Sequence, residues 1–397
     1  MEVATFLMQL VLILVSARVL GELASFVKIP AVIGELIAGI LIGPSLFGII
    51  DLNTSIHFLA EIGIILLLFE VGMETDINKL SSAGLKALTV AVGGVIFPLL
   101  LSFFVSYFLF QYSLLTSLFI GCTLTATSIG ITLRVLKELK KQATHESQII
   151  LAAAVLDDIF GIILLSVLYE FSSSGEINIW NIGKIILLIS FFLILSPLIA
   201  KGASYLIEKW EKKTNIPGLL PAILFALILL FAWSAHSLGA PELLGGFVVG
   251  IALSEKFFSP SKTFIHKVET QVKPLVHLFT PIFFVSIGLS LNLKELEWSS
   301  LPIWNLTGTL LLAAVLGKLF SGLFLKGEGN KSKFLIGTSM IPRGEVGLIF
   351  ASVGLSAGVL ESKIYTSLIL VITITTLIAP LVLRCFYKKN KHKTTEA

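Results

Sequence analysis

Two adjacent carboxylates, Asp157 and Asp158, lie near the middle of an apolar segment, residues 147–171, that is long enough to span a membrane. An ionised carboxylate at the bilayer centre costs at least about 2.5–3.5 kcal/mol, and two neighbouring carboxylates also repel each other. Their oxygens can take up a proton or a hard cation, and the two compete for the same atoms. The pair therefore predicts a transporter rather than an enzyme, with one aspartate carrying the ion. The alternative is a structural pair, in which one aspartate forms a salt bridge and the other caps a break.

Two further segments combine polar residues with helix breakers at membrane depth. Thr127 and Ser128 lie in the sequence Thr-Leu-Thr-Ala-Thr-Ser-Ile-Gly-Ile-Thr, which starts at Thr123. Arg343 and Glu345 lie in Ser-Met-Ile-Pro-Arg-Gly-Glu-Val-Gly, where the proline and glycines do not permit a continuous helix. Both segments are predicted to be broken helices. Their carbonyls and hydroxyls suit Na+ or H3O+, and the two charged residues are expected to offset the dipoles of the half-helices.

A few other charges lie inside the apolar segments. Lys318 is the only cation well inside its segment, and the Asp pair is its natural partner, because a buried ammonium needs an anion. The alternative is a lysine that snorkels to the interface, which would require a reach of about 12 Å along the helix. Glu35 and Glu70 lie near predicted span ends and are expected to be hydrated. Glu61 is expected to pair with Arg18.

The elements that must position these residues are transmembrane helices. The chain has 397 residues, is 55% hydrophobic and 14% charged, and has no cleavable leader pattern and no polar stretch long enough for a soluble regulatory domain. Its mean hydropathy is +0.96. Residues 1–397 are therefore expected to form a single integral membrane transporter unit without a cofactor and without nucleic-acid partners. Thirteen candidate spans run near residues 4–24, 30–50, 56–73, 84–110, 113–135, 147–171, 179–206, 217–238, 240–255, 271–291, 299–325, 333–357 and 363–387.

The distribution of basic residues predicts the orientation of these spans. Twenty-two lysines and arginines fall in the odd-numbered loops and the C-terminal tail, whereas the even-numbered loops hold only Lys184, Lys294 and Lys363. Basic loops stay on the cytoplasmic side. The N-terminus is thus predicted to lie outside and the C-terminus in the cytoplasm.

A sequence pattern recurs at an offset of seven spans. A proline followed by glycines four and nine residues later occurs at Pro30 and again at Pro241, and in each case the next span carries a matching glycine, Gly72 and Gly288. Because seven is odd, the two copies must be inverted relative to each other. This pattern predicts two inverted six-helix repeats, at about 4–171 and 217–387, joined by a connecting helix at 179–206. The alternative is that small-residue helix interfaces converge on such spacings.

Together, Thr125-Ala-Thr127-Ser128, the Asp pair, buried Lys318 and Pro342-Arg-Gly-Glu345-Val-Gly resemble the monovalent cation:proton antiporter-2 family, and most of all its NapA-type bacterial Na+/H+ antiporters. The resemblance covers essentially the whole chain. It implies an all-α polytopic fold with crossed, broken helices, and a homodimer in the bacterial inner membrane that works by elevator-like alternating access. Position by position, it implies that Asp158 is the essential ion-binding carboxylate, that Asp157 pairs with Lys318, and that Thr127 lies at the unwound crossing.

The resemblance also frames the choice of transported ion. It implies exchange of Na+ for protons, with both aspartates as Na+ ligands, and K+ or Li+ as further possible cations. Kef-type K+/H+ systems are the main alternative, but they usually show Gln-Asp at the pair and often carry a C-terminal regulatory domain. The Asp-Asp pair and the short tail favour ungated, electrogenic Na+/H+ exchange. A further alternative is an organic-anion symporter of related fold, but such a protein is expected to have a less acidic core than this one.

Overall fold

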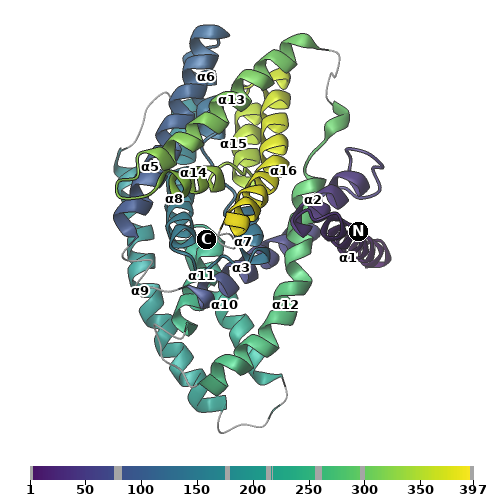
Figure 1. Cartoon of the computed structure of the whole chain (residues 1–397), viewed down its shortest axis with the longest axis vertical. Helices are drawn as coiled ribbons and strands as arrows, with labels where there is room; N and C mark the ends of the chain where they lie inside the picture. The colour runs from purple at the N-terminus through teal and green to yellow at the C-terminus, as the bar shows by residue number, and fades with distance from the viewer. Residues whose placement is uncertain are drawn as a thin grey trace.

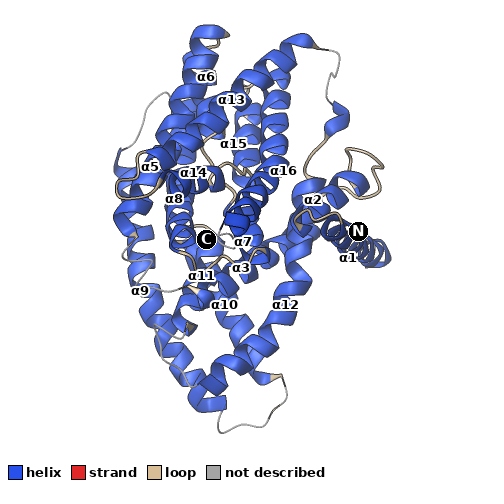
Figure 2. Cartoon of the chain, viewed as in Figure 1, coloured by secondary structure: helices blue, strands red, loops and turns tan. Residues whose placement is uncertain are grey.

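The computed structural model describes residues 3–75, 83–174, 179–211, 216, 218–254, 262–295 and 300–393. Every regular element in these ranges is helical, as Figure 2 shows. Nine helices in the described ranges are long and apolar enough to cross a membrane. They are α1 (Val3–Phe26), α3 (Thr54–Glu74), α5 (Gly84–Phe104) with its π-helical continuation η1 (Val105–Leu109), α8 (His145–Ser174), α9 (Ile179–Glu211), α10 (Leu219–Ser237), α12 (Lys262–Leu289), α13 (Leu301–Leu323) and α16 (Ser362–Lys393). The all-α membrane fold is confirmed, whereas the total of thirteen spans stays a prediction.

Two apolar helices, α2 (Ala31–Ile42) and α11 (Glu242–Leu253), are only 12 residues long. Each follows a proline, whose fixed φ suits the start of a helix. The predicted span at 30–50 was too long, because Gly43 is extended and Pro44 follows it, and this pair ends the helix at Ile42. A short 3-10 turn, η2 (Leu293–Glu295), follows α12.

Two predicted spans are each broken into a pair of half-helices. The first consists of α6 (Leu114–Thr123) and α7 (Ile129–Glu138), and the second of α14 (Asn330–Ser339) and α15 (Glu345–Ser356). The non-helical stretches, 124–128 and 340–344, are those that the polar and helix-breaking residues predict. The crossed, broken helices of the predicted fold are therefore confirmed.

The helices pack in two groups. One contains α1, α2, α3, α10, α11 and α12, and the other contains α5 to α8 and α13 to α16. Within each group the helices make extensive contacts, whereas the direct contacts between the groups in the described residues are narrow and run from α2 and α3 to α7 and α16. Helix α9 contacts α10 and α11 of the first group and α8 of the second. In Figure 1, α9 runs along one edge of the molecule and α1 lies at the opposite edge. We call the first group the scaffold and the second the core.

Glycines allow the closest helix crossings in the scaffold. An added Cβ at Gly39 of α2 would lie 2.1 Å from the Val285 carbonyl oxygen of α12, and one at Gly250 of α11 would lie 2.1 Å from the Phe69 carbonyl oxygen of α3. No side chain fits at these distances, so backbone meets backbone. Each crossing pairs a glycine of one proposed repeat with a glycine of the other, as expected of two copies related by a two-fold axis. The repeat boundaries stay a prediction.

Candidate functional site

The two broken helices cross at their non-helical stretches. The backbone N–H of Ser128 donates to the carbonyl of Pro342 at 2.8 Å, and the Thr127 hydroxyl donates to the carbonyl of Met340 at 3.2 Å. Both contacts link the break after α6 to the break after α14. Backbone groups that lost their helical partners are thus partly satisfied by the other segment, which is how irregular backbone is tolerated inside a membrane protein.

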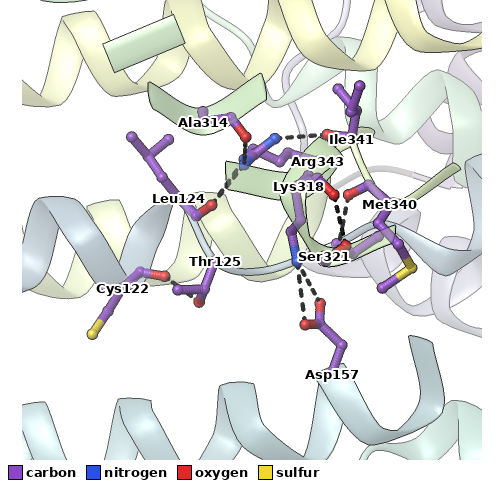
Figure 3. Close-up of polar contacts among 11 residues, drawn as sticks. Cys122, Leu124, Thr125, Asp157, Ala314, Lys318, Ser321, Met340, Ile341 and Arg343 are labelled. Atoms are coloured by element: carbon purple, nitrogen blue, oxygen red, sulfur yellow. Dashed lines mark hydrogen bonds and ion pairs between the residues drawn. The ribbon is translucent and has the colours of Figure 1, made fainter. Parts of the chain in front are cut away.

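Arg343 lies at the crossing and is fully buried. Its guanidinium donates to the carbonyl of Leu124 at 2.7 and 3.2 Å, to that of Ile341 at 2.7 Å and to that of Ala314 at 3.2 Å (Figure 3). Leu124 and Ile341 follow the C-terminal ends of α6 and α14, where the helix dipoles leave partial negative charge. The arginine therefore places one cation at the ends of two half-helices.

Asp157 of α8 and Lys318 of α13 form a buried ion pair beside the crossing. The ammonium lies 3.2 Å from one carboxylate oxygen and 3.3 Å from the other, as drawn in Figure 3. Their side chains are 1% and 0% exposed, so Lys318 does not snorkel to an interface. Thr127, in the break after α6, lies close enough to the Asp157 carboxylate to interact with it electrostatically. The ion pair therefore lies beside the first broken helix.

Asp158 is also buried, with 7% of its surface exposed, and lies close enough to Lys318 to interact with it electrostatically. Because neighbouring residues of a helix point about 100° apart, Asp158 does not share the orientation of Asp157. The Ser128 hydroxyl is buried at the crossing and has no hydrogen-bond partner among the described residues. Glu345 begins α15, and its side chain lies outside the described part of the structure.

Two sequence-based expectations about other charges were wrong. Glu35 and Glu70 are buried rather than hydrated, with 2% and 4% of their surfaces exposed. Arg18 donates to the backbone carbonyl of His277 and not to Glu61. The carboxylate of Glu61 instead lies 3.8 Å from the ring of His57, one helical turn away. Packing of α1 against α12 turns Arg18 away from α3, and the sequence contains no signal of how α1 is rotated about its axis.

The buried glutamates pair with α7, which extends three residues beyond the predicted span at 113–135. Arg134 reaches Glu35 of α2 at 3.3 Å, and Lys137 forms an ion pair with Glu70 of α3. The carboxylate of Glu138 accepts a hydrogen bond at 3.0 Å from the first backbone N–H of α2. These contacts are polar ties between the core and the scaffold. The charged residues of α7 lie three and four positions apart, with apolar residues between them, and this amphipathic spacing was the signal that could have extended the predicted helix to Glu138.

Comparisons with known proteins agree with this architecture. The model of the sodium/hydrogen exchanger transmembrane family matches residues 10–389. The chain is 33% identical to the high-affinity Na+/H+ antiporter NhaS3 of Synechocystis, covering 98% of this chain and 91% of that protein. It is 34% identical to the Na+/H+-K+ antiporter GerN of Bacillus cereus, covering 97% of each. The solved structure of the sodium proton antiporter MjNhaP1 from Methanocaldococcus jannaschii covers 98% of each chain with a TM-score of 0.72 at 19% identity, which shows the shared fold.

Proposed function

Because the chain belongs to the sodium/hydrogen exchanger family, a family of membrane transporters, we propose that it is a secondary active antiporter that exchanges Na+ for protons. The observation that carries the proposal is the buried Asp157–Lys318 pair with Asp158 beside it at a helix crossing. A buried acidic pair with one compensating lysine is suited to exchanging one kind of positive charge for another. It is poorly suited to an organic anion, which the carboxylates would repel.

Asp158 is the proposed ion carrier. Its carboxylate can hold either a proton or Na+, and the carbonyls and hydroxyls of Thr127 and Ser128 at the crossing are oxygen ligands of the kind that hard cations prefer. Asp157 is the proposed accessory carboxylate. When Na+ arrives, its charge competes with the ammonium of Lys318 for Asp157, and the lysine can then release its proton. Two protons for one Na+ would make the exchange electrogenic.

Alternating access is proposed to occur by movement of the core against the scaffold. The two groups share few contacts, and the ties between α7 and the scaffold helices α2 and α3 are ion pairs and hydrogen bonds that can break and reform. Such an interface favours relative motion of two bodies over deformation within them. A homodimer in the bacterial inner membrane, with the N-terminus outside and the C-terminus in the cytoplasm, completes the proposal.

Transport of K+ has to be distinguished from transport of Na+ by experiment. GerN, which matches this chain over nearly its full length, is named as an antiporter of both Na+ and K+ against protons. A Kef-like K+/H+ exchanger is therefore the second candidate function. Li+ is included in the comparison because carboxylate and carbonyl oxygens bind all three ions.

The test is proton flux in proteoliposomes with an imposed pH gradient, measured after addition of Na+, K+ or Li+. Wild-type protein is expected to exchange Na+, and Asp158→Asn to be inactive with unchanged folding, because asparagine keeps the shape but cannot titrate or supply a charge. Asp51→Asn, at an exposed loop position, is the matched control and is expected to transport normally. Na+-dependent proton flux by the Asp158→Asn variant would remove Asp158 from the mechanism, and flux with K+ alone would favour the second function.

A further inference from the structure

Gly94 of α5 faces the buried ion pair. A Cβ at this position would lie 3.3 Å from the Lys318 ammonium nitrogen and 3.8 Å from a carboxylate oxygen of Asp157, and its third nearest atom is the Lys318 Cδ at 3.8 Å. The three nearest atoms thus all belong to the two paired side chains. Helix α5 packs against both α8 and α13, which carry the pair, so the glycine lies where the three helices meet.

The carbonyl of Gly94 lacks its usual helical hydrogen bond. In an α-helix this carbonyl accepts from the backbone N–H four residues later, and here that residue is Pro98, which has no N–H. Pro98 is held in place by Gly317 of α13, where an added Cβ would lie 2.6 Å from the proline nitrogen. Gly317 directly precedes Lys318, so the same close crossing fixes the Gly94 carbonyl relative to the lysine.

The ammonium of Lys318 has more N–H donors than hydrogen bonds among the described residues. It carries three N–H groups, and among the described residues it makes two hydrogen bonds, both to Asp157. The other charged groups that act on it are Asp158 of α8 and Arg343 of the second broken helix. If a cation binds Asp157 and displaces the ammonium, the buried ammonium needs another acceptor, since an unpaired buried charge is strongly unfavourable.

We propose that Gly94 is a positioning residue for ion exchange, whose carbonyl, lacking its usual helical donor, receives the Lys318 ammonium when the transported cation displaces it from Asp157. The missing side chain leaves space for this short movement, and Pro98 keeps the carbonyl available. A carbonyl carries no charge to hold the proton, so the lysine loses its proton more readily there than at the carboxylate. The inference rests on the proposed antiport and adds the place to which the lysine moves.

Two substitutions test this by different means. Gly94→Ala fills the space with a methyl group, whereas Pro98→Ala supplies the missing N–H and occupies the carbonyl without adding an atom beside Lys318. Each is expected to raise the apparent KM for Na+ about tenfold, equivalent to about 1.4 kcal/mol, with little change in kcat. Gly93→Ala is the matched control, because its Cβ would lie 3.2 Å from the Ser321 Cα, in the same helix crossing but away from the ammonium.

Thermal stability provides the second readout. Pro98→Ala removes a proline from a helix interior, so its melting temperature should equal or exceed that of the wild type while its KM rises. Damage to packing would instead lower stability and activity together. A wild-type KM in both Pro98→Ala and Gly94→Ala, in a preparation whose wild type exchanges Na+, overturns this inference alone. Absence of cation-dependent proton flux in the wild type overturns the proposed function and this inference with it.

Discussion

Replacement of Arg343 tests whether this buried cation supports the crossing or takes part in transport. Arg343→Lys keeps the charge but cannot reach all three carbonyls that the planar guanidinium contacts, at 2.7 to 3.2 Å. Loss of two charge-assisted hydrogen bonds at about 1.5 kcal/mol each gives a destabilisation of about 3 kcal/mol. Arg343→Gln also removes the charge that offsets the two half-helix ends, so it is expected to be destabilised further.

These free energies can be measured as shifts in melting temperature. The unfolding entropy of a chain of 397 residues is about 0.8 kcal/mol per kelvin on the usual per-residue scale, so 3 kcal/mol corresponds to a decrease of roughly 4 °C for Arg343→Lys. The assay is thermal unfolding of purified protein in detergent, followed by transport in proteoliposomes below the melting temperature. Folded Arg343→Lys protein should keep a wild-type KM for Na+, because the arginine contacts backbone carbonyls rather than the ion site.

An Arg343→Lys variant with a wild-type melting temperature but a strongly changed KM or proton coupling would contradict a purely structural role for Arg343. Arg343 would then act on the transported ion, and its four hydrogen bonds would contribute little to stability. Arg134→Lys is a suitable comparison, since Arg134 belongs to half-helix α7 and its guanidinium contacts carboxylates at the edge of the core, whereas Arg343 lies in the non-helical stretch of the other broken helix.

Three further predictions concern the ion pairs and the pH response. Lys318→Gln should lower the melting temperature and change the number of protons exchanged per Na+, which is measured from the dependence of flux on membrane potential. If neither quantity changes, the ion pair with Asp157 has no role in coupling. Glu35→Gln should weaken the contact between α7 and α2 and raise the maximal transport rate without changing the KM for Na+. The control Glu269→Gln breaks an ion pair within α12 only and should leave the maximal rate unchanged. Equal maximal rates in the two variants would argue against a contact that limits motion. Acidification should raise the KM for Na+ by simple competition between protons and Na+ at the carboxylates, so joint replacement of three histidines on or near the predicted cytoplasmic loops should leave the pH profile within a full unit of wild type. These histidines are His145, His266 and His277.

The type of protein and the position of its unusual residues along the helices follow from the amino-acid sequence alone. Apolar runs of span length require helices, because in lipid every backbone group must be satisfied within the structure. Pro342 and Gly344 within such a run predict a break, and the structure has one at 340–344. Asp157 could be identified as an unusual buried charge because a carboxylate at the middle of a span has a large insertion cost. For Lys318 the snorkelling alternative was excluded only by the structure.

The contacts between side chains of different helices depend on how the helices pack. The sequence places Asp157 and Asp158 about 100° apart on one helix, but the rotation of that helix about its axis depends on packing against α5, α6 and α14. For the same reason it could not show that Arg343 spans the ends of two half-helices, nor that Glu35 is buried against α7. Periodicity gives the relative angle of residues within one helix, whereas partners on different helices are set by contacts between segments far apart in the chain.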